Sequence, residues 1–155
     1  MLEQDRLFMA KALKLAKKAA LRGEVPIGAL IVTAYGQIIG QGYNCVEKYK
    51  CQNQHAEARA IVQATKHMAD WRLDQCTLYV TLEPCMMCMG LVALSRIERV
   101  VYGAQSPLFG FHLDKEGLST LYTRQIKNIT EGVLAAESSE LLKEFFTQKR
   151  EKKNV

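Results

Sequence analysis

The amino-acid sequence predicts a single domain of the α/β class, with about five strands and a helix near each end of the chain. Three observations support this class. Apolar residues recur at mostly three- and four-residue steps over 3–22, which indicates a helix, and we expect a closing helix over 134–149. Short β-rich runs lie between these two helices. With 155 residues, 48% of them hydrophobic, the chain can build one core without disulfides or a partner.

The first half of the chain reads as a helix followed by a hairpin. Gly23 ends the first helix, because glycine readily adopts the conformation that terminates one. Two short strands are expected over 28–33 and 37–42. Tyr35-Gly36 between them supplies a tight turn, so we expect the strands to pair antiparallel.

The middle of the chain contains two helices around a buried strand. A loop over 44–54 leads into a helix over about 55–67. The run 77–82 is β-rich and nearly all apolar, which suits a central strand. Pro84 is expected to open the next helix, which runs through Ser95, because proline is well placed at a first helical position.

The remaining elements surround a long connection. A short strand is expected over 99–103 and a last strand over 126–131. Between them, 104–116 reads as a loop that contains Pro107. Loops of this length in small domains are often functional.

The composition excludes several classes of protein. No hydrophobic run reaches roughly 18 residues, so no segment is expected to span a bilayer. The first five residues, Met1 to Asp5, are acidic and helical, which does not fit a secretory signal. Five cysteines, an odd number, argue against a disulfide framework. We therefore expect a protein of the reducing cytoplasm with no membrane association.

The positive charge is concentrated at the end of the chain. The formal net charge is +5. Within 143–153, Lys143, Lys149, Arg150, Lys152 and Lys153 stand against Glu144 and Glu151, which leaves +3 there. We expect 149–155 to form a basic, partly flexible tail of the single domain 1–155. Such an end attracts phosphates, but it is also what a solvated helix end looks like when cations complement the helix dipole.

Three residues have the chemistry and spacing of metal ligands. Cys85 and Cys88 are three apart at the start of a helix, so both thiols share one face near the positive end of the helix dipole. That placement favours thiolates, which are the form that binds metal. His55 also begins a helix, and zinc suits such a mixed sulfur and imidazole set. We expect one Zn²⁺ per chain at this site.

Glu57 is the candidate for proton transfer. Three protein ligands leave one tetrahedral position open, as in catalytic zinc sites, and zinc lowers the pKa of water bound there toward about 7. Glu57 is two residues from His55, so it does not share its helix face and does not read as a fourth ligand. The combination of H-x-E with P-C-x-x-C is typical of zinc nucleobase deaminases, in which the glutamate is the general acid/base.

Plainer interpretations of these residues remain open. Cys85 and Cys88 fit a redox pair, or a structural zinc site with a fourth ligand such as Cys51. Cys45, Cys51 and Cys76 read as buried or free thiols, His67 as a surface histidine, and Met86, Met87 and Met89 as packing residues.

The chain resembles the bacterial tRNA-specific adenosine deaminases of the TadA type, within the cytidine-deaminase-like superfamily, over nearly its whole length. The residues that carry the resemblance are Glu24–Gly28, Gly42–Asn44, His55–Glu57, Tyr79–Cys85, Ser95–Ile97, Ile129–Leu134 and Phe145-Phe146. The metal motifs are shared across the superfamily, whereas the two ends of the chain point to this branch.

The resemblance implies a three-layer α/β/α fold with a mixed sheet, a homodimer, and conversion of adenosine to inosine at the wobble position of tRNA. It implies that Asn44 hydrogen-bonds the flipped base and that Val25 and Pro26 line its pocket. Phe145, Phe146 and Arg150 of the closing helix would lie against the anticodon stem-loop. Stacking on aromatic and cationic surfaces suits single-stranded RNA.

Two segments depart from the family pattern. Cys51–Gln54 replaces an Asp-Pro-Thr-Ala run, and Gln105–His112 replaces a loop rich in Lys, Ala and Gly. Both lie where substrate selection is expected. Two further functions are therefore considered, a deaminase of free guanine, cytosine or a nucleoside, and a zinc-stabilised nucleic-acid-binding module without catalysis. Glu57 argues against the second, since a structural site gains nothing from a carboxylate beside an open metal position.

Overall fold

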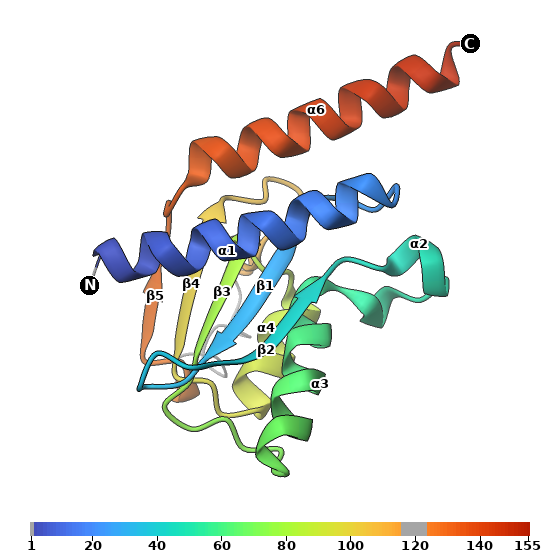
Figure 1. Ribbon diagram of the computed structural model, residues 1–155. Coiled ribbons are helices and arrows are strands. Elements are labelled where there is room, and N and C mark those ends of the chain that lie inside the picture. Colours follow the sequence, from blue (N-terminus) through green and yellow to red (C-terminus); the bar gives the residue numbers. More distant parts are fainter. Residues whose placement is uncertain (1, 116–123) are drawn as a thin grey trace.

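The fold is a five-stranded mixed sheet with helices on both faces (Figure 1), as seen in a computed structural model that describes residues 2–115 and 124–155. The strands lie in the order β2-β1-β3-β4-β5. The elements are α1 (Leu2–Leu21), β1 (Gly28–Val32), β2 (Ile38–Tyr43), α2 (Val46–Tyr49), η1 (Gln52–Gln54), α3 (Ala56–Met68), β3 (Thr77–Leu82), α4 (Met86–Leu94), β4 (Arg99–Ala104), η2 (Phe111–Leu113), β5 (Asn128–Thr130) and α6 (Ala135–Lys153).

Two apolar layers sandwich the sheet, which confirms the three-layer α/β/α class. Helices α3 and α4 cover one face, while α1 and the start of α6 cover the other (Figure 1). Successive residues of β3 alternate between the layers. Leu78 and Val80 join the α3 and α4 side, and Tyr79 joins the α1 side. Each fully buried aliphatic side chain of this kind stabilises the fold by about 1.5–3 kcal/mol.

Strand β1 runs opposite to the other four described strands, and the parallel strands β3 and β4 end at the same edge of the sheet. β1 pairs antiparallel with β2 and with β3, whereas β3, β4 and β5 run parallel. The register pairs Leu82 with Ala104, so the carboxyl ends of β3 and β4 meet at one edge. Residues that bind ligands in α/β sheets gather at such an edge.

A buried ion pair fastens α1 to the opposite end of these strands. Arg99 donates two hydrogen bonds of 2.8 Å to the Asp5 carboxylate, and Tyr79 donates a third of 2.8 Å. The Asp5 side chain is only 3% exposed. Burial opposes its ionisation, but the hydrogen bonds from Arg99 and Tyr79 prevail and hold the pKa of Asp5 below its ordinary value.

The hairpin, the central strand and the closing helix are confirmed, and three details differ from the sequence-based expectations. The 44–54 loop contains α2 and η1. Pro84 is not the first helical residue, because Cys85 is the N-cap and α4 begins at Met86. Helix α6 continues to Lys153, since no glycine or proline interrupts it, so most of the expected 149–155 tail is helical. The flexibility of that tail stays a prediction.

The 104–116 connection is described as far as residue 115, and Glu116 lies outside the described residues. Its described part includes η2 and a single β-bridge between Gly110 and Cys85. Across the described ranges, no helix is both long and apolar enough to cross a membrane.

Candidate metal centre and active site

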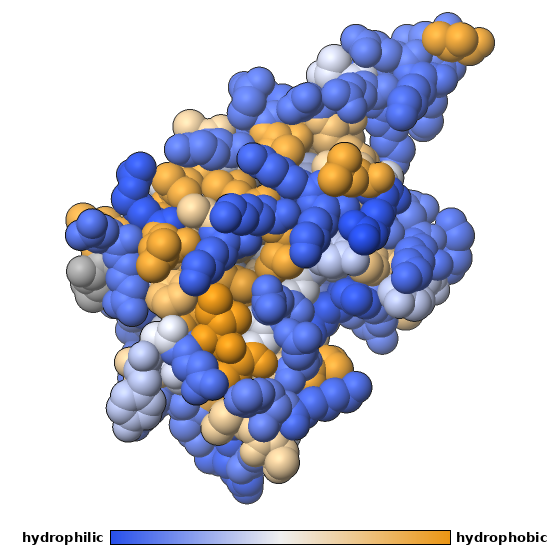
Figure 2. All heavy atoms as spheres, viewed as in Figure 1, coloured by the Kyte–Doolittle hydropathy of each residue, from blue (hydrophilic) through white to orange (hydrophobic). Residues whose placement is uncertain are grey.

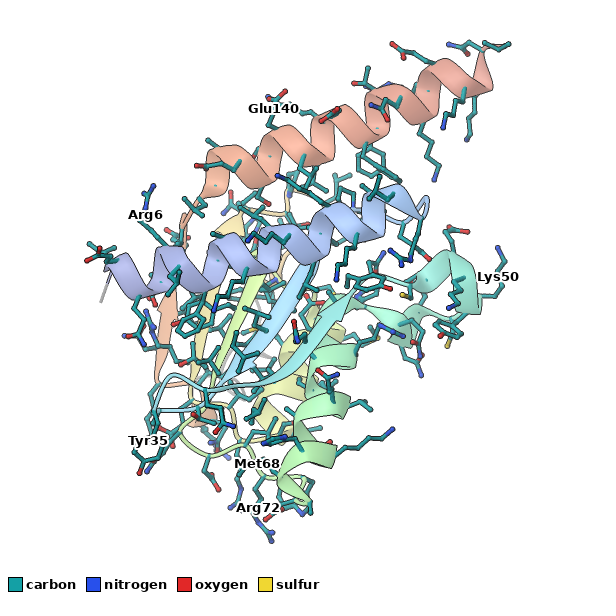
Figure 3. All side chains as sticks on the ribbon, viewed as in Figure 1. Arg6, Tyr35, Lys50, Met68, Arg72 and Glu140 are labelled. Atoms are coloured by element: carbon teal, nitrogen blue, oxygen red, sulfur yellow. The ribbon has the colours of Figure 1, made fainter. Side chains whose placement is uncertain are left out.

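The three expected metal ligands come together at the N-termini of two helices. His55 is the N-cap of α3 and Cys85 is the N-cap of α4, both in an extended conformation. Cys88 lies one turn into α4. In Figure 3, Met68 marks the far end of α3, so the site lies at the opposite end, toward α2 and Lys50.

The distances fit a tetrahedral metal ion. The Nδ1 atom of His55 lies 3.7 Å from the Sγ atom of Cys85 and 3.5 Å from that of Cys88. Ligands bound to zinc at about 2.05 Å (nitrogen) and 2.3 Å (sulfur) in a tetrahedron would lie about 3.6 Å apart. All three donor atoms lie within 4.8 Å of one another. The donor set therefore fits zinc, with one position left for a water or substrate.

The site is electrostatically prepared to bind a cation. The hydrogen bond with Cys88, followed by that with His55, lowers the pKa of the Cys85 thiol to about 4 although burial opposes this. The same pairing, with burial, raises the pKa of Cys88. The hydrogen bond with Cys85 raises the pKa of His55. Cys85 is therefore the thiolate, and metal binding would release the proton of Cys88.

Glu57 lies in the first turn of α3 beside this group. It is 4% exposed, and burial raises its pKa above the ordinary value. Among the described residues, the metal-ligating group contains His55, Cys85 and Cys88, without Glu57 or Cys51. A carboxyl group that is buried next to a metal site and has a raised pKa is suited to take up and return protons.

Asn44 is a second buried polar side chain in this region. It is 5% exposed, and its Oδ1 atom has no hydrogen-bond partner among the described residues. Its backbone N–H donates to the Ile27 carbonyl at 3.1 Å, which places Asn44 beside the segment of Val25 and Pro26. Val25 is half-buried and Pro26 is buried. A buried amide oxygen without a partner costs free energy, so the Oδ1 atom of Asn44 is a candidate for contact with a ligand.

The expected contacts on α6 belong to a separate groove. Phe145 and Phe146 contact each other edge to face, with ring centroids 5.3 Å apart. Phe146 and Arg150 line a groove of about 490 Å³ together with Leu142, Lys143 and Thr147. The outer end of α6 is almost entirely hydrophilic (Figure 2). Among the described residues, none of His55, Cys85 and Cys88 lines this groove.

A larger groove of about 660 Å³ opens beside Cys85. Its apolar lining comes from the start of α4 and from the 105–115 loop, namely Met86, Met87, Leu108, Phe109 and Leu113. Gly110, Asp114 and Lys115 also line it. Because Cys85 itself lines this groove, the loop that departs from the family pattern forms a wall next to the candidate metal centre.

Sequence reasoning missed two buried carboxylates that organise this region. Glu24 is 2% exposed and accepts hydrogen bonds from the backbone N–H groups of Glu47 at 2.7 Å and Lys48 at 3.0 Å, which holds α2 in place. Glu83 is also 2% exposed and binds the 105–115 loop. In the sequence, each of these glutamates is visible only as an acidic residue beside an apolar strand or motif, and nothing there indicates which groups it binds.

The remaining cysteines behave as expected. All five lie in the described ranges and are free thiols, with Cys45 and Cys76 buried and Cys51 exposed. Cys85 and Cys88 are not joined by a disulfide.

Comparisons with known proteins agree with this chemistry. The family model of MafB19-like deaminases matches residues 3–150. The tRNA-specific adenosine deaminase of Bacillus subtilis is 44% identical, covering 98% of this chain and 94% of that protein. The enzyme of the same name from Streptococcus pyogenes is 40% identical, covering 99% of this chain and 90% of that protein.

Solved structures show the same fold. A structure from a study of A-to-I editing by tRNA:A34 deaminases at the wobble position superposes with a TM-score of 0.77 and 35% identity, covering 87% of this chain and 98% of that one. Guanine deaminase from Nitrosomonas europaea superposes with a TM-score of 0.79 and 27% identity, covering 88% and 81%. The chain therefore belongs to the deaminase family that includes the tRNA-specific adenosine deaminases.

Proposed function

We propose that this protein is a zinc-dependent hydrolase that deaminates adenosine to inosine at the wobble position of tRNA, with residues 1–155 acting as one deaminase domain. The observation that carries the proposal is the convergence of His55, Cys85 and Cys88 beside the buried Glu57. This arrangement occurs in a chain 40–44% identical to enzymes named tRNA-specific adenosine deaminases.

The proposed chemistry divides between the metal and the carboxyl group. When bound by His55, Cys85 and Cys88, zinc would supply a Lewis acid that lowers the pKa of a water molecule toward about 7. Glu57 takes one proton from the attacking water and passes it to a ring nitrogen of the purine, then takes the remaining proton from the hydroxyl group added to the ring and passes it to the leaving amine. Adenosine and water thus give inosine and ammonia.

Substrate contacts are proposed at Asn44, Val25 and Pro26 and, in the separate groove, on α6. The buried amide of Asn44 hydrogen-bonds the flipped base, and Val25 and Pro26 line its pocket. The unpartnered Oδ1 atom of Asn44 supports this role. Phe145, Phe146 and Arg150 lie against the anticodon stem-loop, where aromatic rings stack on unpaired bases and cations neutralise phosphates.

A homodimer is proposed through the outer face of α4. Met86 and Met87 are 44% and 45% exposed, and Leu94 is 77% exposed. The neighbouring loop adds Leu108 and Phe109, which are 75% and 74% exposed. Apolar surface concentrated on one helix and an adjoining loop is typical of protein–protein interfaces. Because the proposed substrate is tRNA, we also propose that the enzyme acts in the cytoplasm.

Deamination of a free base is the second candidate, because the fold also matches guanine deaminases. One experiment separates the two. The purified protein is incubated with an anticodon stem-loop that carries adenosine at the wobble position, and in parallel with guanine, cytosine and free adenosine. We expect inosine in the stem-loop by nucleoside mass spectrometry and little ammonia from the free compounds. Ammonia from guanine with an unchanged stem-loop would contradict the proposal.

A further inference from the structure

The Glu83 side chain joins the two ends of a loop segment that lies next to Cys85. Its side chain is fully buried. Its carboxylate accepts hydrogen bonds from the backbone N–H of Ser106 at 3.0 Å and from that of His112 at 3.0 Å. The Nδ1 atom of His112 donates to both carboxylate oxygens at 2.7 Å. The two ends of the 106–112 segment therefore meet on one carboxylate.

The same loop holds the backbone that carries Cys85. The N–H of Phe111 donates to the Pro84 carbonyl at 3.0 Å, and Gly110 forms a β-bridge with Cys85. A Cβ atom at Gly110 would overlap the Glu83 carboxylate, so the loop packs directly on this side chain. On the other side, the N–H of Glu83 donates to the Ala104 carbonyl at 2.8 Å. The Glu83–Cys85 segment is thus held between β4 and the loop.

The conformation of the loop depends on the hydrogen bonds that the buried Glu83 carboxylate accepts. A charge removed from water is tolerated only when hydrogen bonds replace its hydration, and bonds to a charged acceptor are about twice as strong as neutral ones. Three N–H donors, the backbone N–H groups of Ser106 and His112 and the His112 ring, converge on the buried Glu83 carboxylate. Removing the charge or the His112 donor would free the loop and the Cys85 backbone together.

We propose that Glu83 is a positioning residue that holds the Cys85 backbone in place through His112 and the 105–115 loop. By holding Cys85, it sets how tightly the site retains zinc. The inference rests on the proposed function, because it assumes a zinc ion on Cys85. Groups that orient metal ligands typically change metal affinity or activity by about 10–100-fold when mutated. His112 lies in the segment that departs from the family pattern, so this positioning uses a residue of this chain's own loop.

The test measures zinc retention by the full-length protein. Glu83→Gln keeps the shape of the side chain but presents an amide NH₂ to N–H donors. His112→Ala removes one donor, whereas His112→Asn keeps an N–H donor close to the position of Nδ1. Asp5→Asn is the control for general destabilisation, since Asp5 is a buried, hydrogen-bonded carboxylate under α1 on the other face of the sheet. Zinc release to a chromogenic chelator is followed well below the unfolding temperature of each variant.

We expect Glu83→Gln and His112→Ala to release zinc about 10–100-fold faster than wild type. His112→Asn should stay close to wild type, and Asp5→Asn should lower the unfolding temperature without faster release. Added zinc should restore the kcat of Glu83→Gln on the stem-loop, with its KM unchanged. If Glu83→Gln fails to fold, the comparison of His112→Ala with His112→Asn carries the test.

Release at the wild-type rate from both Glu83→Gln and His112→Ala would overturn the inference. Equal acceleration by Asp5→Asn would also overturn it, because the effect would then be general destabilisation. Failure of the proposed function looks different. A wild-type protein that holds zinc but makes no inosine refutes the proposed function. The zinc release rates of the variants then still test the positioning role of Glu83. A wild-type protein that binds no zinc refutes both.

Discussion

Replacing Gly42 with alanine should damage both stability and turnover, because β2 packs directly on the first turn of α3. A Cβ atom at Gly42 would overlap the Ala56 carbonyl oxygen and would lie 2.8 Å from the Ala60 nitrogen and 2.9 Å from the Arg59 Cβ atom. Ordinary carbon–carbon contacts are about 3.5–4.0 Å, so α3 must move away by roughly 0.6–1.1 Å. Overpacking of this kind costs about 1–3 kcal/mol of unfolding free energy.

The same displacement would reach His55 and Glu57, which lie at the start of α3. A shift of about 1 Å in catalytic groups can lower turnover by about 100-fold. The unfolding free energy would be measured by urea titration followed by circular dichroism, and kcat would be measured on the stem-loop.

Gly40→Ala is the matched control for this prediction. A Cβ atom there overlaps the Ala60 carbonyl oxygen and lies 2.9 Å from the Ala64 Cβ atom, farther along α3 from the metal site. We expect a similar loss of stability and a smaller loss of kcat. Wild-type stability in Gly42→Ala would refute the packing argument. Equal losses of kcat in the two variants would refute the link between the first turn and catalysis.

Three further predictions concern the ion pair, the metal and the basic end. Asp5→Asn should lower the unfolding free energy by about 1.5–3 kcal/mol at neutral pH. Because the folded-state pKa of Asp5 is lowered, its contribution is complete above the ordinary value of 3.8 and is lost as the pH falls through the folded-state value, so urea titrations of wild type and variant should converge in acid. Cys85→Ala should lose most of its zinc in elemental analysis, and full zinc content would count against the ligand assignment. Removing residues 149–155 should weaken tRNA binding and flatten its salt dependence without changing zinc content, whereas superimposable binding curves would show a merely solvated helix end.

Local sequence patterns predicted most of the fold, because burial and helix starts each restrict which residues can follow one another. The strand over 77–82 was predicted with the boundaries of β3, because its side chains are buried on both faces and must be apolar along the whole run. The grouping of His55, Cys85 and Cys88 could be expected from the sequence because each lies at a helix start or within its first turn, where a short motif determines the local geometry, and their role as metal ligands stays a prediction.

The parts that escaped prediction depend on contacts distant in sequence. Glu24 holds α2 across 23 residues, and Glu83 holds His112 across 29. No local sequence pattern predicts such a partner, because the sequence does not distinguish a glutamate that will be buried from one that will be exposed. Helix α2 has only four residues, and Glu24, distant in sequence, accepts hydrogen bonds from two N–H groups in its first turn, so no local pattern predicts it. Pro84 was misplaced because Cys85 takes the N-cap position.

The proposed hydrolysis with Glu57 as the proton shuttle is tested most directly by deamination of the stem-loop in ¹⁸O-labelled water, with wild type and with Glu57→Gln. We expect inosine at the wobble position that carries one oxygen from water. We expect a zinc-loaded Glu57→Gln variant to be slower by about 100-fold or more, because an amide cannot shuttle protons. Inosine without the label would contradict hydrolysis. A zinc-loaded variant that keeps more than about a tenth of the wild-type rate would contradict the role of Glu57.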